Sequence, residues 1–231
     1  MQTLTTYPTF IDLVGDRVQA TPQQTAFTFL KDGEPDGVSL TYRQLDERAR
    51  AIATHLRSQV TMGDRVLLIY PYDAGLEFIT AFLGCLYGGV VAVPCHPPRN
   101  RSAVEDVMGR VVASGAQAIL APRAIQAKLK RQLTQEGSAD LPSGLDGFRV
   151  ESLRWVVPED VSQTAAADWQ RPDVGRDTLA FLQYTSGSTG QPKGVMLTHA
   201  DLLANIRAMC DAVAASPDDV FVSWLPLYHD M

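Results

Sequence analysis

The sequence predicts an α/β fold with a largely parallel sheet and flanking helices. Segments whose apolar residues recur at helical spacing alternate along the 231-residue chain with short apolar runs that are typical of buried strands. The hydrophobic fraction of 45% and the charged fraction of 20% are ordinary for a globular protein. We expect two subregions, residues 1–175 and 176–231, because residues 158–175 show no regular pattern.

The first predicted helix and strand lie between residues 41 and 70. Thr41 and Gln44 have the spacing of a capping box, in which each side chain satisfies a free backbone donor at the start of a helix. Apolar residues then recur at helical spacing, at Leu45, Ala49, Ile52, Ala53 and Leu56. After Gly63 and Asp64, residues 65–70 have the pattern of a buried strand and are apolar from Val66 onward.

Residues 78–98 carry no charge, and a stretch of this length could cross a membrane as a helix. Gly88, Gly89 and Pro94 interrupt it, and such residues break helices. We therefore predict a helix over about residues 75–87, a glycine stop and a buried strand at residues 90–93, and no membrane span. Residues 1–10 are polar and lack the pattern of a signal peptide.

The alternation continues through the rest of the first subregion. A helix, a strand, a second helix and a second strand are predicted at residues 104–114, 118–120, 123–133 and 154–157. Gly115 is expected to end the first of these helices. Residues 135–147 hold Gly, Ser, Pro and Asp without a period, which predicts an exposed loop.

Charge and cysteine content argue against several classes of protein. The formal net charge of −6 argues against nucleic-acid binding, because no basic surplus exists to neutralise phosphates. The three cysteines, Cys85, Cys95 and Cys210, have the spacing of neither a zinc site nor a disulfide framework, and no histidine pair has metal-ligand spacing. We expect no metal site formed by the chain itself, and buried, inert thiols in a reducing cytoplasm.

The most informative part of the chain begins at residue 178. Residues 178–184 form a strand candidate that runs directly into the sequence TSGSTGQPKG, and residues 195–197 form a second strand candidate. Thr198 and Asp201 then have the spacing of a helix start. The apolar residues of that helix are Leu202, Leu203, Ile206, Met209, Cys210 and Val213.

The loop between these two strands has the chemistry of a polyphosphate site. Gly187 and Gly190 allow successive backbone N–H groups to point to one side and form an anion-binding concavity. Hydroxyl donors recur through the loop, at Thr185, Ser186, Ser188 and Thr189. Lys193 adds a cation, and no acidic residue within the loop would repel a phosphate.

Two common phosphate motifs do not fit this loop. A Walker A loop needs Gly-Lys followed by Ser or Thr, and a dinucleotide fingerprint needs Gly-x-Gly-x-x-Gly; neither is present here. A flexible Ser/Gly linker is the plain structural alternative. The Pro-Lys-Gly at the end of the loop and the strands on both sides favour phosphate binding over that alternative.

Two segments resemble signature motifs of the adenylate-forming superfamily, which includes acyl-CoA synthetases, luciferases, the adenylation domains of nonribosomal peptide synthetases and the fatty acyl-AMP ligases. Residues 184–194, YTSGSTGQPKG, are similar to its phosphate loop. Residues 224–231, WLPLYHDM, are similar to its next motif, which lines the acyl pocket. Residues 63–71, 82–94 and the Pro-Pro-Arg at 97–99 resemble the fatty acyl-AMP ligases, although Cys95 and His96 depart from that pattern.

This resemblance implies a reaction and a set of site residues. A fatty acid carboxylate attacks the α-phosphate of ATP, bound with Mg²⁺, and forms an acyl-adenylate that passes to an acyl carrier protein. The β- and γ-phosphates are assigned to Thr185, Ser186, Gly187, Ser188, Thr189, Gly190 and Lys193. Lys193 and His229 are the candidate catalytic residues, with His229 between the acyl pocket and the reacting phosphate.

The resemblance also implies that the chain is an N-terminal fragment, because members of the superfamily are more than twice as long. We expect such a fragment to expose apolar surface and to have little or no ligase activity by itself. An acyl-CoA synthetase is the main alternative, and an amino-acid-activating domain is a third reading. A non-catalytic nucleotide-binding remnant is the alternative from another class, and a reading frame that continues past Met231 would argue against it.

Overall fold

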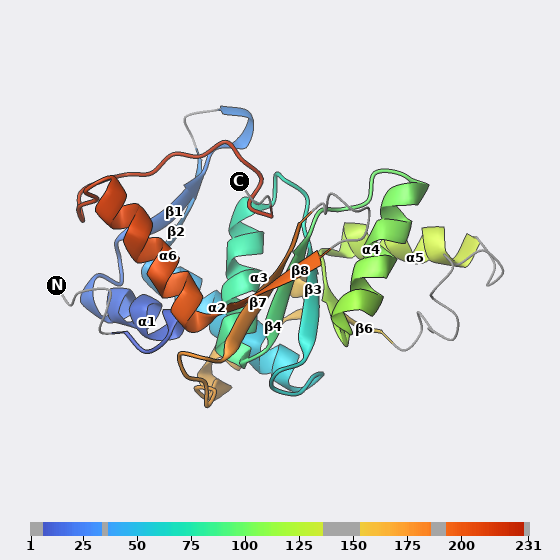
Figure 1. The fold of residues 1–231 in the computed structure, drawn as a ribbon, viewed down its shortest axis with the longest axis horizontal. Helices are drawn as coiled ribbons and strands as arrows, with labels where there is room; N and C mark the ends of the chain where they lie inside the picture. The colour runs from blue at the N-terminus through green and yellow to red at the C-terminus, as the bar shows by residue number, and fades with distance from the viewer. Residues whose placement is uncertain (1–6, 34–36, 136–152, 186–192, 229–231) are drawn as a thin grey trace.

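A six-stranded sheet forms the centre of the protein, whose structure is a computed structural model that describes residues 7–33, 37–135, 153–185 and 193–228. The strand order is β6-β5-β3-β4-β7-β8 (Figure 1). The strands are β3 (Arg65–Ile69), β4 (Val91–Cys95), β5 (Ala118–Leu120), β6 (Arg154–Val156), β7 (Leu179–Thr185) and β8 (Lys193–Thr198). All neighbours are parallel except the edge strand β8, which pairs antiparallel with β7, so the predicted α/β class is confirmed.

Helices cover both faces of this sheet and a smaller antiparallel pair lies beside it (Figure 1). The helices are α1 (Phe10–Ala20), α2 (Tyr42–Arg57), α3 (Gly75–Gly88), α4 (Arg101–Ser114), α5 (Arg123–Gln135) and α6 (His199–Ala212). The described residues also include the short 3₁₀ turns η2 (Lys31–Gly33), η4 (Pro158–Asp160) and η5 (Gln163–Asp168). The small pair consists of β1 (Thr25–Phe29) and β2 (Val38–Thr41).

Most predicted elements are present, with ends that local hydrogen bonds explain. The capping box at the start of α2 is confirmed, because the backbone N–H of Gln44 donates to Thr41 Oγ1 over 3.2 Å and Thr41 N–H donates to Gln44 Oε1 over 2.9 Å. Helix α4 begins three residues earlier than predicted, since Asn100 Oδ1 accepts from Ala103 N–H and caps it. The expected loop at residues 135–147 lies almost wholly outside the described residues.

The uncharged stretch at residues 78–98 forms most of α3 and all of β4. Gly89, with a φ of 66°, takes the left-handed conformation that ends α3, as the sequence predicted. Within the described part of the chain, no helix is long and apolar enough to cross a membrane.

Alternating side chains of the central strands pack on opposite faces of the sheet. On one face Leu67 and Ile69 pack with helix α4, through residues such as Val107, in one hydrophobic cluster. On the other face Val66 and Leu68 pack with α2 and α3 in a second cluster. A strand buried on both faces is apolar throughout, which explains the continuous apolar run at residues 66–69.

Helices α2 and α3 approach each other closely at a glycine. A Cβ added to Gly84 would lie 2.5 Å from Ile52 Cγ2 and 2.8 Å from Ile52 Cβ. Both positions are in the buried face of their helices, so neither the Ile52 side chain nor a methyl group added at position 84 could turn toward solvent. Glycine at position 84 therefore sets the distance between the two helices.

The segment after β6 is tied to α2 and α3 through Trp169. Its indole N–H donates to the Tyr87 carbonyl over 2.9 Å, and the Arg50 guanidinium lies 4.5 Å from its ring centroid. Beneath it, the buried Asp46 carboxylate accepts from Tyr87 Oη over 2.9 Å and lies 2.7 Å from Arg50 Nε. These contacts fix the segment, which leads into β7. Strand β7 pairs with β4, so strands from both sides of residue 175 belong to one sheet. The division into two subregions at that residue stays a prediction.

A buried histidine links the first and the last of the described helices. His199, the first residue of α6, is 1% exposed, and its Nδ1 accepts the Phe10 backbone N–H at the start of α1 over 3.4 Å. An ion pair of 2.7 Å between Asp12 and Arg171 lies close by. Burial lowers the pKa of His199 below its ordinary value of 6.5, and Asp12 opposes this shift while Arg171 adds to it.

We expect Gly84→Ala to destabilise the protein by about 1–3 kcal/mol, because the new methyl group overpacks the contact between α2 and α3. Gly109→Ala is the matched control, since Gly109 lies in α4 and a Cβ there would meet nothing within 4 Å. That change should stabilise by about 0.5–1 kcal/mol through helix propensity. Denaturant unfolding measures both; similar effects of the two substitutions would contradict the packing argument.

Acidification should destabilise the protein through His199. Its pKa in the folded state is below the unfolded value of 6.5, so the unfolded chain takes up a proton first and the free energy of unfolding falls as the pH drops below 6.5. His199→Asn keeps an acceptor but cannot titrate. Its free energy of unfolding should therefore depend less on pH between about 5 and 7 than that of the wild type. Equal slopes for the two proteins would overturn this account.

Candidate functional site

The two ends of the predicted phosphate loop lie side by side at the carboxyl ends of the parallel strands. Thr185, the last residue of β7, pairs with Lys193, the first residue of β8. A Cβ on Gly194 would lie 3.1 Å from Cζ of Tyr184, so glycine lets this ring lie against the edge strand. Ser186, Gly187, Ser188, Thr189 and Gly190 lie outside the described residues. The tertiary structure therefore fixes the entry and the exit of the loop.

The order of the strands makes this edge a natural place for a ligand. The chain passes from β3 to β4 on one side, then returns across β3 to β5 on the other side. The connecting helices α3 and α4 consequently pack on opposite faces of the sheet. In open α/β sheets, ligands bind at the carboxyl ends of the strands, where such a reversal opens a crevice.

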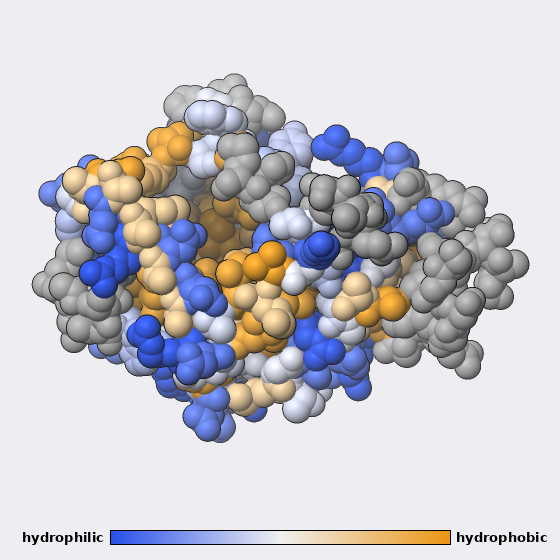
Figure 2. Space-filling view, viewed as in Figure 1, coloured by the Kyte–Doolittle hydropathy of each residue, from blue (hydrophilic) through white to orange (hydrophobic). Residues whose placement is uncertain are grey.

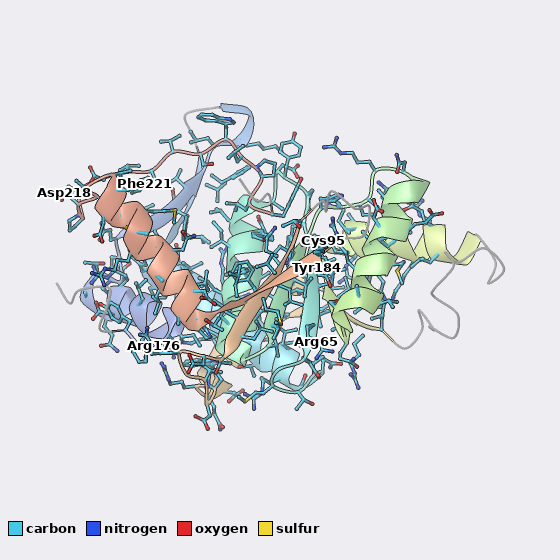
Figure 3. All side chains as sticks on the ribbon, viewed as in Figure 1. Arg65, Cys95, Arg176, Tyr184, Asp218 and Phe221 are labelled. Carbon is cyan, nitrogen blue, oxygen red and sulfur yellow. The ribbon has the colours of Figure 1, made fainter. Side chains whose placement is uncertain are left out.

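The residues after β4 lie beside the start of the phosphate loop. Strands β4 and β7 are parallel with Ala92 opposite Phe181, and Cys95 and Tyr184 near their carboxyl ends belong to one hydrophobic cluster. Figure 3 shows Cys95 and Tyr184 together in the upper part of the sheet, with Arg65 and Arg176 at its opposite edge. Residues 89 positions apart in the sequence thus meet here.

Arg110 of α4 reaches this edge from one face of the sheet. Its Nη1 lies 3.1 Å from Cys95 Sγ and 3.3 Å from His96 Nδ1. The pKa of His96 is lowered, first by burial and then by the positive charge of Arg110. The Cys95 thiol has a raised pKa because it is buried, so it is a poor nucleophile.

The sequence did not place His96 among the predicted site residues. The signal that could have found it is its position directly after a buried strand, where loops of parallel strands gather. Arg110 had no such local signal, because only the packing of α4 brings its side chain to the strand ends.

The C-terminal segment returns to the same edge. The Tyr228 ring centroid is 6.3 Å from that of His96, and Leu227 packs over the start of α3, where a Cβ on Gly75 would lie 3.6 Å from its Cδ1. His229 is next in the chain but lies outside the described residues. The structure therefore brings the segment that precedes His229 to the edge that carries Thr185 and Lys193.

Exposed hydrophobic side chains lie on the edge strand and on the segment after α6 (Figure 2). In β8, Val195 and Met196 are 46% and 70% exposed, and beyond α6 the residues Phe221 and Trp224 are 74% and 90% exposed. The amount of such surface agrees with the expectation of exposed apolar groups.

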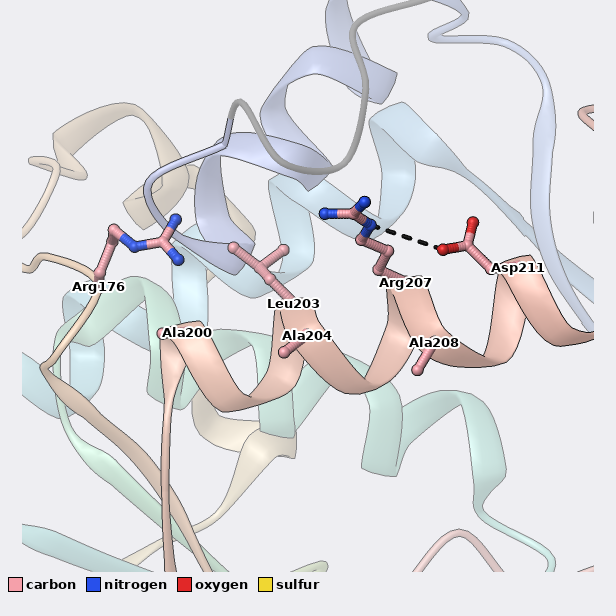
Figure 4. A pocket seen from close by; sticks show the side chains of 7 residues that line it. All are labelled: Arg176, Ala200, Leu203, Ala204, Arg207, Ala208 and Asp211. Carbon is pink, nitrogen blue, oxygen red and sulfur yellow. Dashed lines mark ion pairs between the residues drawn. The ribbon is translucent and has the colours of Figure 1, made fainter.

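A separate groove of about 410 Å³ runs along α6 (Figure 4). It is lined by Arg176, by small residues such as Ala200 and Ala204, and by Arg207, which forms an ion pair of 3.6 Å with Asp211. The Ala200 N–H donates to the Arg176 carbonyl at the amino end of β7, which is the edge of the sheet opposite Thr185. The groove is therefore distinct from the phosphate-loop edge.

Among the described residues, no group of three or more His, Cys, Asp or Glu side chains is arranged to hold a metal ion. Polar residues that could contact an anion, in contrast, lie at the carboxyl edge. Thr185 ends β7, Lys193 begins β8 beside it, and His96 follows β4. The described part of this edge is suited to bind an anionic group.

Comparisons with known proteins agree with this geometry. Residues 14–231 match a family model described as AMP-binding enzyme. The chain is 39% identical over 227 residues to a medium-chain-fatty-acid–[acyl-carrier-protein] ligase, JamA, of Moorena producens, covering 97% of this chain and 36% of that protein. It is 35% identical over 222 residues to a long-chain-fatty-acid–AMP ligase, FadD23, of Mycobacterium tuberculosis, covering 91% of this chain and 35% of that protein.

A solved structure has the same fold. The fatty acyl-adenylate ligase of Legionella pneumophila, in complex with acyl adenylate and pyrophosphate, superposes with a TM-score of 0.82 at 32% identity. The match covers 99% of this chain and 37% of that one. The chain thus spans little more than a third of the length of the proteins that it resembles.

Proposed function

The chain belongs to the AMP-binding enzyme family, and from this membership we propose that the protein which contains it activates a fatty acid as its acyl-adenylate. The observation that carries this proposal is the pairing of Thr185 with Lys193 at the carboxyl edge of a parallel sheet. That pairing holds the two ends of a glycine- and hydroxyl-rich loop where an anion is expected to bind. The names of the relatives support a fatty acid as the substrate.

In the proposed reaction, a carboxylate oxygen of the fatty acid attacks the α-phosphorus of ATP. The bond between that phosphorus and the oxygen bridging to the β-phosphate breaks, and pyrophosphate leaves with the bond electrons. Such phosphoryl chemistry depends mainly on positioning and on donors that stabilise the developing charge. We assign these donors to the loop residues Thr185, Ser186, Gly187, Ser188, Thr189, Gly190 and Lys193. His229 is assigned to the space between the acyl group and the reacting phosphate.

Magnesium is proposed to enter as a complex with ATP. The described residues include no acidic cluster that would hold the ion in the absence of nucleotide. Oxygens of the phosphates are suitable ligands for Mg²⁺, which keeps several waters and binds few protein groups in sites of this kind. The role assigned to this part of the chain is therefore to bind the phosphates.

An acyl carrier protein is proposed as the acceptor of the acyl group. The name of the Moorena producens relative supports this choice. Coenzyme A is the alternative acceptor, which would make the protein an acyl-CoA synthetase. A nucleotide-binding protein without catalysis is the alternative from another class, and it would bind ATP without releasing pyrophosphate.

We expect Lys193→Ala to slow adenylate formation strongly in the protein that contains this chain. Loss of one preorganised donor typically costs about 3 kcal/mol of transition-state stabilisation, which is more than a hundred-fold in rate. Pyrophosphate release with ATP, Mg²⁺ and a long-chain fatty acid measures the effect. Lys31→Ala is the control, because Lys31 is exposed in η2 and far from the loop in the sequence. An unchanged rate for Lys193→Ala would rule out the assignment.

The acceptor is tested with the preformed acyl-adenylate complex. A holo acyl carrier protein should accept the acyl group as a thioester on its phosphopantetheine thiol, whereas free coenzyme A should not. Mass spectrometry of the two acceptors after incubation gives the answer. Transfer to coenzyme A at a rate equal to or above that to the carrier protein would make the protein an acyl-CoA synthetase instead.

A further inference from the structure

The ring of Tyr184 lies against the edge strand directly after Lys193. Strands β7 and β8 pair Tyr184 with Gly194 and Thr185 with Lys193. A Cβ on Gly194 would lie 3.1 Å from Cζ, 3.3 Å from Cε2 and 3.4 Å from Oη of Tyr184. The ring therefore covers the backbone at position 194 and fills part of the space that a side chain there would need.

The core holds this ring in place. Tyr184 is 8% exposed and belongs to one hydrophobic cluster with Leu182 of its own strand and with Met108 and Val111 of α4. Because protein interiors are close-packed, the ring can move away from Gly194 only if these neighbours also move. The contact is thus fixed from the side of the core.

The edge strand itself buries little side-chain surface where it begins. Residues 193–196 are all exposed, and Val195 and Met196 are 46% and 70% exposed. A glycine within a strand weakens it, because it loses more backbone entropy and has no side chain to pack. An aromatic ring opposite such a glycine on the neighbouring strand compensates for this loss. Tyr184 provides that ring next to Lys193.

We infer that Tyr184 is a positioning residue for Lys193: its ring holds Gly194 against β7 and so fixes the backbone that carries the lysine. This inference rests on the proposed function, in which Lys193 stabilises the charge that develops as pyrophosphate leaves. Such stabilisation needs a donor that is in place before the reaction. A looser start of β8 should therefore reduce the rate of adenylate formation, and it should leave the binding of the fatty acid nearly unchanged.

The first test removes the ring. In the protein that contains this chain, Tyr184→Leu should lower the kcat of pyrophosphate release roughly ten- to hundred-fold, because a small misplacement of a reacting group costs that much. The KM for the fatty acid should change little. Tyr184→Phe keeps the ring and should recover most of the loss. Met108→Ala is the matched control: it removes buried packing from the same cluster but lies in α4, so it should lower the stability and leave kcat unchanged.

The second test combines substitutions, since residues that act as a unit give non-additive losses. Gly194→Ala should also lower kcat, because its methyl group would lie 3.1 Å from the Tyr184 ring. In the Tyr184→Leu background the same methyl group should cost little further, because the ring is gone. Tyr184→Leu should likewise cost little further in the Lys193→Ala background, because the lysine through which it acts is absent. Additive losses in either pair would overturn the inference.

The outcomes separate this inference from the proposed function. If the wild type releases no pyrophosphate, the ligase proposal fails, and amide hydrogen exchange of residues 193–198 decides whether Tyr184 fixes β8: faster exchange in Tyr184→Leu than in Met108→Ala supports this, and equal exchange overturns it. If the wild type is an active ligase, a wild-type kcat in Tyr184→Leu, or an equal loss in Met108→Ala, makes the inference wrong. Should Tyr184→Leu fail to fold, Gly194→Ala decides: a reduced kcat supports the inference, and an unchanged kcat overturns it.

Discussion

The parallel pairing of β4 with β7 is the interaction on which the rest of the structure depends. It joins strands that are separated by two crossover helices and by the segment that carries Trp169, and it places Ala92 opposite Phe181. Because the strands are parallel, both of their carboxyl ends meet at one edge of the sheet. The described residues at this edge follow from this pairing: Thr185 ends β7, Lys193 pairs with Thr185, and His96 follows β4.

Burial on both faces of the sheet is what holds these strand ends in place. Helix α4 packs on one face and places Arg110 at the strand ends. Helix α3 packs on the other face, and Leu227 packs against its start at Gly75. The contact of Gly84 with Ile52 and the tilted contact of the Trp169 and Tyr87 rings keep α2 and α3 in position. The site is therefore built on rigid elements, and its loop residues depend on a packed scaffold.

Local patterns predicted much of the fold because their causes are local. The capping boxes at Thr41 and Thr198, the stop at Gly89 and the buried strands need only neighbouring residues, and the structure has them. The elements before residue 41 were not predicted. Helix α1 carries a capping box at Thr9, a signal that could have revealed it, whereas β1 alternates only weakly between exposed and half-buried residues and offers little pattern.

The sequence by itself determined the fold class and the family, and it predicted the chemistry of the phosphate loop. These depend on residue types at fixed short spacings, such as the glycines, hydroxyls and lysine of residues 185–193. Only the tertiary structure decided that Arg110 of α4 contacts the His96 ring and that His199 joins α6 to α1. The physical reason is that strand register and helix packing bring distant residues together through burial of the whole sheet, and no short stretch of sequence encodes that sum.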